Sequence, residues 1–293
     1  MGSLATGAGD ARAIIEVSRR RRFTRHIGLG LERVAAIGTP IILIIALVWI
    51  WFPLVDLAFM SVNKVPERGI PTLHVTWTWY RQLFQQGTVS SSLWSSVELA
   101  LVVGVIVAVP AVFGAWKFLD LRTRAQSRVL GVLLIPVFVP GLVFGFAMLI
   151  YASALGFPQG YMTLAAVHIG WAFPFSFLAA LIGASRFDRR LLAAASDLGA
   201  SRWQRFRDVE LPLLRGTIVA AFLFGFLLSF DELPRSLLIG GQVQTLPLYV
   251  WAEDYSRSSN IPITYALTTL IMLGSLVILA VAFWFLFRGS ERE

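Results

Sequence analysis

Long apolar segments alternate with short polar ones along most of the chain, and only the first 33 residues lack this pattern. A helix that crosses the hydrocarbon layer of a bilayer needs about 20 apolar residues. Val34–Val55 and Leu99–Trp116 contain no charged residue, and each predicts one membrane span. Residues 129–185 are also free of charge but are too long for one helix, and "ASALGFPQGY" (152–161) interrupts them with glycines and a proline. They therefore predict a third and a fourth span.

Two further spans follow a polar loop. The fifth begins at Pro212, because proline suits the first turn of a helix, and we expect it to continue beyond Phe230. The sixth covers about 261–287. The pattern thus predicts an all-α integral membrane protein with six transmembrane helices. Its domain organisation is a tail at 1–33, a six-span domain at 34–288 with a loop at 186–215, and a short tail at 289–293.

Composition supports the membrane class and excludes several kinds of site. The chain is 57% hydrophobic and 14% charged, whereas a soluble domain is about half apolar and a quarter charged. It has no cysteine, so disulfides, thiolate metal sites and cysteine nucleophiles are excluded. His26, His74 and His168 lie far apart, which argues against a histidine-rich metal centre. We expect neither a metal nor a catalytic residue in this chain.

The basic residues are distributed unevenly between the two sides that six spans create. Most arginines lie in the N-terminal tail, in 117–128 and in 186–215, whereas the loops on the other side hold few. The positive-inside rule then places both termini in the cytoplasm (N-in/C-in). The apolar run after the tail is too long for a signal-peptide core, and the tail itself is expected to lie disordered on anionic lipid. The net charge of +8 therefore needs no nucleic-acid partner.

The 186–215 loop carries local signals for a folded structure. Asp188 is placed to cap a helix, and Gly199 suits the left-handed residue that ends it. Ser201 and Gln204 have the spacing of a capping box, which predicts a second short helix. The residues alone leave two interpretations of its exposed surface. It is either a docking site for a protein or a helix pair lying on the bilayer.

A family resemblance decides between these interpretations. The loop contains "AAA" (193–195), Gly199 after three residues, and "VELP" (209–212) after nine more. This spacing resembles the EAA loop of bacterial ABC importer permeases, in which Glu-Ala-Ala, Gly and Ile-x-Leu-Pro stand at the same intervals. "TWTWYRQLF" (76–84) and "IPVFVPGLVFG" (135–145) are similar to the spermidine/putrescine-type branch of that family. The resemblance covers most of the six-span domain.

The resemblance implies a type I importer permease fold in the bacterial inner membrane. The loop would insert into a groove of a cytoplasmic ATPase dimer, which would bind ATP and Mg²⁺, while this chain would bind no cofactor. The absence of a phosphate loop ending in Gly-Lys-Ser/Thr agrees with that. A second permease chain, expected as a heterodimer partner, and a periplasmic solute-binding protein would complete the machine.

The resemblance assigns a set of loop residues to ATPase coupling. The assigned residues are Ala193, Ala194, Asp197, Leu198, Gly199, Ala200, Ser201, Trp203, Phe206, Leu211 and Pro212. One position departs from the family pattern, because Ala193 stands where the family has glutamate. The departure removes one polar contact to the ATPase and leaves the turn at Gly199 undisturbed.

The motif "SFDELPRS" (229–236) places two adjacent carboxylates at the end of the fifth span. Gly216–Phe230 spans about 22 Å as a helix, so Asp231 and Glu232 are expected in the outer third of the membrane. A carboxylate facing lipid there is costly, so the pair should face a water-filled cavity or a partner chain. The predicted substrate pathway comprises Asp231, Glu232, Phe230, Trp171 and Phe173.

The acidic pair favours a polyamine such as putrescine or spermidine, as in the branch that the chain resembles. Arg235 lies four residues after Asp231, however, and an intrahelical salt bridge between them would leave Glu232 as the only attractor. A zwitterionic or organophosphonate solute would then fit about as well. A third possibility is that Asp231 and Arg235 only brace the helix against the partner permease.

Other classes of function have weaker support. A membrane-embedded enzyme would need paired catalytic groups, and no Ser-His-Asp or metal-ligand spacing is visible. A channel or secondary transporter would be indicated by inverted repeats, and none is obvious between the two halves. His168 lies alone among apolar residues, where a histidine is more often hydrogen-bonded in the core than a ligand. Trp171 could line the pathway or simply pack.

Overall fold

The computed structural model describes residue 36 and residues 38–64, 74–256 and 261–287. The predicted tails at 1–33 and 289–293 lie outside these residues. The chain divides into two units, residues 1–57 and 58–293. The first unit holds most of the apolar helix Gly38–Ser61, which corresponds to the predicted first span and ends a few residues later than predicted. Every regular element in the described ranges is a helix, apart from one isolated bridge between Asn63 and Val75.

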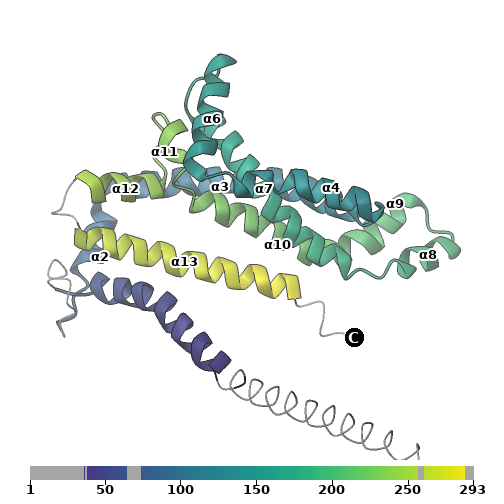
Figure 1. The fold of residues 1–293 in the computed structure, drawn as a ribbon, viewed down its shortest axis with the longest axis horizontal. Coiled ribbons are helices and arrows are strands. Elements are labelled where there is room, and N and C mark those ends of the chain that lie inside the picture. The colour runs from purple at the N-terminus through teal and green to yellow at the C-terminus, as the bar shows by residue number, and fades with distance from the viewer. Residues whose placement is uncertain (1–35, 37, 65–73, 257–260, 288–293) are drawn as a thin grey trace, which may run out of the picture. The chain divides into compact units, whose positions relative to one another are not determined.

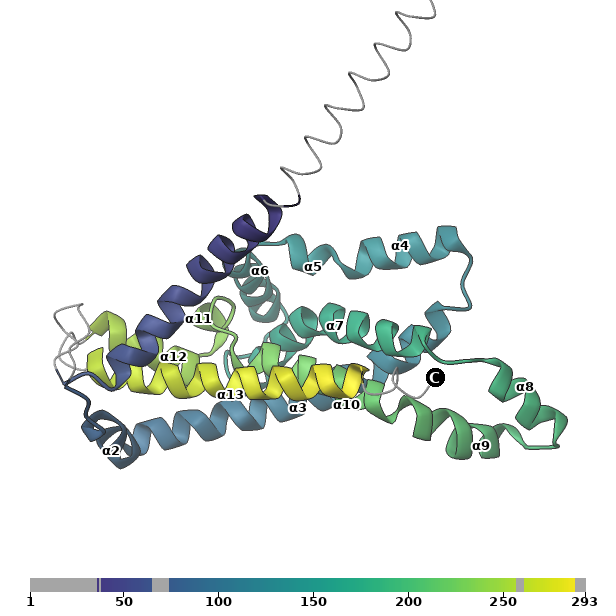
Figure 2. The same ribbon diagram turned by 90° about the horizontal axis from the view of Figure 1, so that it is seen from below.

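The second unit is built around three long helices that pack on one another. These are α3 (Gly87–Phe118), α7 (Tyr161–Ser185) and α10 (Leu211–Phe230), and α13 (Ile261–Phe287) lies along α10 (Figure 1, Figure 2). Small residues mediate the closest approach. A Cβ added to Gly225 of α10 would lie 3.2 Å from Cα of Gly104 in α3, so the two glycines allow the backbones of these helices to approach closely.

Short helices flank the long ones. The helix α2 (Thr78–Gln85) precedes α3, and α12 (Leu246–Ser256) precedes α13. The described helices long and apolar enough to cross a bilayer are Gly38–Ser61, Gly87–Phe118, Tyr161–Ser185, Arg202–Phe230 and Ile261–Phe285. These five helices confirm an all-α membrane protein. Six crossings with both termini in the cytoplasm stay a prediction.

The predicted third span is not one continuous helix. The segment forms α4 (Thr123–Leu133), α5 (Ile135–Phe138) and α6 (Gly141–Ala154). Pro136 and Pro140 lie at the two breaks. They account for the breaks because proline lacks a backbone N–H and disfavours the helical conformation of the residue before it. The helices α4 and α5 run in the direction of the long helices, whereas α6 stands across them (Figure 1, Figure 2). The predicted break before the fourth span is confirmed.

The fifth span also ends earlier than predicted. The helix α10 ends at Phe230, Asp231–Arg235 form a turn, and α11 covers Ser236–Ile239. The expectation that the span continues through the carboxylate motif is therefore wrong. Pro234 provides the physical reason, since it cannot donate a hydrogen bond to the carbonyl of Phe230 and its ring clashes with that carbonyl in a continuous helix. Asp231 and Glu232 therefore lie in this turn and not in the helix that they were expected to share.

Candidate functional site

The loop before α10 folds as its local sequence signals predict. The helix α8 covers Arg190–Asp197, and the Asp188 carboxylate accepts a hydrogen bond of 2.9 Å from the backbone N–H of Arg190. Gly199 has a φ of 81°, the left-handed conformation expected of it. Ser201 and Gln204 form the reciprocal capping box that opens α9 (Arg202–Arg205). The Gly199 turn and the capping box are confirmed, whereas the cap position of α8 is Arg189, and Asp188 bonds the first N–H of the helix from one position earlier.

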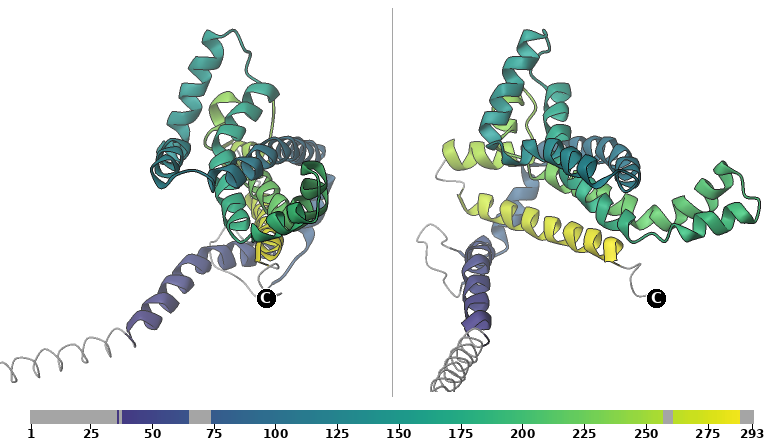
Figure 3. Two further views of the ribbon diagram at one scale, coloured as in Figure 1. Left: turned by 90° about the vertical axis from the view of Figure 1, so that its right-hand side faces the viewer. Right: turned by 45° about the vertical axis from the view of Figure 1, so that its right-hand side comes forward.

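This loop projects from one end of the bundle of long helices (Figure 1, Figure 3). Leu198 is 88% exposed and Trp203 is 64% exposed, so an apolar surface lies on either side of the Gly199 turn. Ala200 and Phe206 are the only partly buried members of the predicted coupling set, and the others are exposed: Ala193, Ala194, Asp197, Leu198, Gly199, Ser201, Trp203, Leu211 and Pro212. Phe206 stacks on Phe113 of α3, with 6.2 Å between ring centroids, and so anchors the loop.

A second anchor joins the loop to the end of α3, and sequence reasoning did not find it. Arg189 forms an ion pair with Asp120, donates a 3.0 Å hydrogen bond to the carbonyl of Trp116, and lies over the Trp116 ring. Phe187 packs edge-on against the same ring at 4.6 Å. Arg189 is one of many arginines in the loop, so no local signal distinguishes it from its neighbours.

The loop passes into α10 without a break in the helical backbone. A π-helical turn, Phe206–Glu210, joins α9 to α10. Pro212 has no N–H to bond the carbonyl of Asp208 as an α-helix requires, which accounts for a wider turn at this position. Because the described backbone stays helical from Arg202 to Phe230, a force on the loop acts directly on α10.

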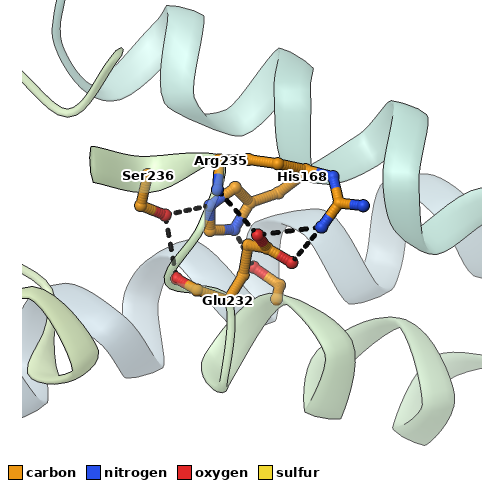
Figure 4. A network of polar contacts seen from close by, with 5 residues as sticks. His168, Glu232, Arg235 and Ser236 are labelled. Atoms are coloured by element: carbon orange, nitrogen blue, oxygen red, sulfur yellow. Dashed lines mark hydrogen bonds and ion pairs between the residues drawn. The ribbon is translucent and has the colours of Figure 1, made fainter. Parts of the chain in front are cut away.

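At the other end of α10, Glu232 and Arg235 form a buried ion pair. Nη1 of Arg235 lies 3.0 Å and 2.9 Å from the two carboxylate oxygens, and the backbone N–H of Arg235 donates to the same carboxylate at 3.0 Å (Figure 4). The Glu232 side chain is 5% exposed and the Arg235 side chain is 5% exposed. A buried charge is tolerated only when it is paired and hydrogen-bonded, and this carboxylate meets both conditions.

His168 of α7 is fully buried beside this pair. Its Nδ1 lies 2.8 Å from the hydroxyl of Ser229 and its Nε2 lies 2.9 Å from the hydroxyl of Ser236 (Figure 4). Ser229 is in the last turn of α10, and Ser236 opens α11. The expectation that His168 is hydrogen-bonded in the core is confirmed. The imidazole joins both sides of the turn after α10.

Trp171 lies one helical turn further along α7 and covers the guanidinium. The Cζ of Arg235 is 3.5 Å from a Trp171 ring centroid and 5.7 Å from the ring of Phe144 in α6. A cation over an aromatic face is attracted by the ring quadrupole. The cation on the face of Trp171 is thus a side chain of this protein, and a place for Trp171 in the solute pathway stays a prediction.

Asp231 lies in a different environment from Glu232. It is exposed, and one oxygen of its carboxylate accepts a 2.9 Å hydrogen bond from the Ser275 hydroxyl of α13. The possible salt bridge between Asp231 and Arg235 is not present, because the arginine pairs with Glu232. The sequence suggested that Arg235 would neutralise Asp231 and leave Glu232 as the attractor. The structure shows the opposite, because Arg235 neutralises Glu232 and the carboxylate of Asp231 is exposed.

The five predicted pathway residues have different surroundings in the described structure. Glu232 and Trp171 meet through Arg235. Phe230 is buried and stacks on Phe226 at 5.8 Å, while Phe173 packs into the core near Phe177. In the described ranges, no group of three or more histidine or acidic side chains could hold a metal ion. A role for each of these residues in solute passage stays a prediction.

The comparisons with known proteins identify the family. A family model described as "Binding-protein-dependent transport system inner membrane component" matches residues 100–288. The chain belongs to this family. The match includes α7, the loop with its Gly199 turn, and α10, so both ends of α10 lie inside the family domain.

Named relatives extend the likeness over most of the chain. The spermidine/putrescine transport system permease protein PotC of Haemophilus influenzae is 26% identical over 235 residues, covering 80% of this chain and 90% of the relative. The putrescine transport system permease protein PotI of Escherichia coli K12 is 26% identical over 265 residues, covering 86% and 92%. The resemblance to the spermidine/putrescine-type branch is confirmed. The chain is a homologue of permease subunits, and these are transport proteins, not enzymes.

A solved structure shows the same fold at low sequence identity. A chain of a bacterial alginate ABC transporter, solved with an alginate pentasaccharide-bound periplasmic protein, superposes with a TM-score of 0.60 at 14% identity. The superposition covers 86% of this chain and 93% of that one. At this identity the likeness concerns the fold alone, and it confirms the ABC importer permease fold.

Proposed function

We propose that this permease is a transmembrane subunit of an ATP-driven importer that passes a polyamine, such as putrescine or spermidine, into the cytoplasm. The observation that carries the proposal is homology over 80% or more of the chain to permease proteins named for these two solutes. The family description, which names binding-protein-dependent transport, supports a solute-binding protein as the donor. The bacterial inner membrane is the proposed location.

The proposed coupling begins at the exposed Gly199 turn. Leu198 and Trp203 supply apolar surface for the groove of a cytoplasmic ATPase dimer, which binds ATP and Mg²⁺. Closure of that dimer moves the loop, and the continuous helical backbone through the π-helical turn transmits the movement to α10. Because α10 packs on α3 and α7, its displacement opens one side of the domain and closes the other. A second permease chain forms the other half of the pathway.

The proposed attractor for the solute cation is Asp231. It is the exposed carboxylate of the motif, whereas the Glu232 charge is compensated by Arg235 within the fold. One carboxylate can bind one ammonium end of a diamine. The same observation supports a second candidate, a zwitterionic or organophosphonate solute, because the motif offers one free negative charge in place of the two that the sequence suggested.

Uptake in whole cells tests this proposal. The permease and its partner subunits are expressed in a strain that lacks polyamine uptake, with radiolabelled putrescine, spermidine and 2-aminoethylphosphonate as separate probes. We expect putrescine or spermidine to accumulate, and a partner ATPase that cannot hydrolyse ATP to abolish the accumulation. Uptake of the phosphonate alone would favour the second candidate. Polyamine uptake that persists without the ATPase would contradict the ATP-driven mechanism.

A further inference from the structure

A closed set of buried side chains fastens the turn after α10 to its neighbours. We call it the latch and define it as His168, Ser229, Glu232, Arg235 and Ser236 (Figure 4). All five side chains are buried, and they come from α7, the end of α10, the turn and the start of α11. The proposed transport mechanism uses none of these contacts, so their role is open.

With His168 in its neutral form, the hydrogen bonds of the latch allow one consistent arrangement of protons. The Ser236 hydroxyl has one proton and donates it to the carbonyl of Glu232 at 2.9 Å. Ser236 must therefore accept from Nε2–H of His168, and the bare Nδ1 of the same neutral ring accepts from the Ser229 hydroxyl. Each hydroxyl proton and each ring nitrogen has a partner inside the protein. Both ring nitrogens of His168 are occupied by these bonds, so the imidazole has no atom left for a solute, and within the latch the buried atom without a hydrogen-bond partner is Nε of Arg235.

The ion pair has a different part in the latch. Glu232 and Arg235 belong to the same turn, so their bond does not by itself join two elements. It compensates the charge of Arg235, which allows the guanidinium to lie buried between Trp171 of α7 and Phe144 of α6. The side chain of Arg235 thus reaches two helices that are separate in the sequence.

The backbone of the turn also packs tightly on α6. A Cβ added to Gly145 would lie 3.0 Å from the carbonyl oxygen of Arg235, and one added to Gly141 would lie 3.0 Å from Cβ of Pro234. Both contacts are tighter than ordinary van der Waals packing, so an added Cβ would require a shift of a few tenths of an ångström, and the turn lies directly against α6. Four elements, α6, α7, α10 and α11, therefore meet around Arg235.

We infer that Arg235 and His168 are positioning residues that hold α6, α7 and the turn after α10 together as one rigid unit during transport. Movement of α10 at the coupling loop then carries this whole unit, and Asp231 with it. The latch does not open to bind the solute. This inference rests on the proposed function in so far as it assigns the movement to solute import.

A reversible cross-link tests the inference directly, because this chain contains no cysteine. Gly141→Cys combined with Pro234→Cys places two thiols on Cβ atoms that the structure puts 3.0 Å apart, so a relaxation of about half an ångström reaches the ~3.5–4.5 Å that a disulfide takes. The assembled transporter in nanodiscs is oxidised, and disulfide formation is followed by gel mobility. We expect the bond to form and to cause no loss of ATP hydrolysis or of putrescine uptake. The two single-cysteine variants are the controls.

Two results of the cross-link would overturn the inference. A disulfide that stops ATP hydrolysis and uptake, both restored by reductant, would show that α6 and the turn separate in the cycle. Failure of the disulfide to form in an inserted double variant, when both single-cysteine variants take up putrescine normally, would show that they are not packed together. Because ATP hydrolysis is measured without added solute, this readout decides the inference even if the unmodified transporter takes up no polyamine, which is the outcome that sinks the proposed function.

A pair of substitutions separates positioning from solute binding. Arg235→Met leaves the Glu232 carboxylate buried without its ion pair, and we expect the maximal uptake rate to fall at least about tenfold. The KM for putrescine should be unchanged, and Arg235→Lys, which keeps the charge, should restore part of the rate. The matched control is Arg124→Met, which removes an arginine from an exposed position of α4 outside the latch.

The uptake kinetics of these variants can also contradict the inference. A raised KM with an unchanged maximal rate in Arg235→Met would make the turn a solute site and overturn the inference. If Arg235→Met is absent from the membrane by immunoblot, the double variant Glu232→Gln with Arg235→Met is measured, since it removes both charges together. A maximal rate equal to that of the unmodified protein in an inserted double variant would contradict a positioning role for Arg235.

Discussion

The two ends of α10 are held in place by different kinds of interaction. At the loop end, Asp188, Gly199 and the Ser201–Gln204 capping box act within a few residues of one another, and the surface they create is exposed. At the other end, the hydrogen bonds of His168 join residues that are 61 and 68 positions apart, and the side chains of His168 and Arg235 are buried. The exposed end is suited to contact a partner, whereas the buried end is suited to transmit a displacement.

The largest effect is expected at the loop end from Gly199→Val. A φ of 81° is strained for any L-residue and most of all for a β-branched one, so the turn between α8 and α9 would change direction. We expect uptake to be abolished and membrane insertion to be unchanged, as measured by transport assays and immunoblots of membranes. Gly131→Ala, where an added Cβ meets nothing within 4 Å, is the matched control. Normal uptake by Gly199→Val would refute the coupling role of this turn.

The next largest effect is expected at the buried end from His168→Ala. The substitution leaves the hydroxyls of Ser229 and Ser236 without their ring partner, which costs about 1–3 kcal/mol for each unsatisfied group. The melting temperature of the detergent-purified protein should fall clearly. His74→Ala, at an exposed position, should leave it unchanged. Equal melting temperatures for the two variants would mean that the latch contributes little to stability.

Asp231→Asn distinguishes the two carboxylates of the motif at that end. Removing the exposed charge should raise the KM for putrescine about tenfold, corresponding to ~1.4 kcal/mol, with little change in stability. Kinetics of initial uptake rates provide the measurement. Ser275→Ala keeps the carboxylate and should change KM far less. If Asp231→Asn transports with an unaltered KM, this carboxylate does not bind the solute.

The smallest effect is expected from Arg189→Met in the loop anchor. The Arg189–Asp120 pair is about half exposed, and exposed ion pairs contribute roughly 0–1 kcal/mol. Stacking of Phe206 on Phe113 remains to hold the loop. We expect the uptake rate to fall by no more than about fivefold. Complete loss of uptake would show that this anchor, and not the helical backbone, transmits the movement of the ATPase.

Sequence-based prediction was accurate for the loop end of α10 and inaccurate for its buried end. The capping box and the Gly199 turn were predicted correctly because each depends on the conformational preferences of residues that are neighbours in the chain. The end of α10 was predicted wrongly, although Pro234 was visible in the sequence. The prediction followed hydropathy, which does not account for the backbone N–H that a proline lacks. The division of the third span at Pro136 and Pro140 was missed for the same reason.

Helical periodicity did not predict the ion-pair partner of Arg235. Spacing of four residues favoured Asp231, but that rule holds only inside a helix, and these residues form a turn. The turn places Glu232 beneath the guanidinium and directs Asp231 towards Ser275. Nothing in the local sequence indicates that Trp171 and Phe144 would cover the arginine, because those contacts depend on how α6 and α7 pack.

By itself the sequence determined the membrane class, the long helices, the helical loop before α10 and the resemblance to importer permeases, because these depend on hydropathy, capping and fixed spacing. The tertiary structure alone decided which carboxylate is neutralised and which is exposed, and it alone joined His168 to both sides of the turn. The physical reason is that the energy of a buried charge or hydroxyl depends on its partners in space. Those partners come from helices far apart along the chain.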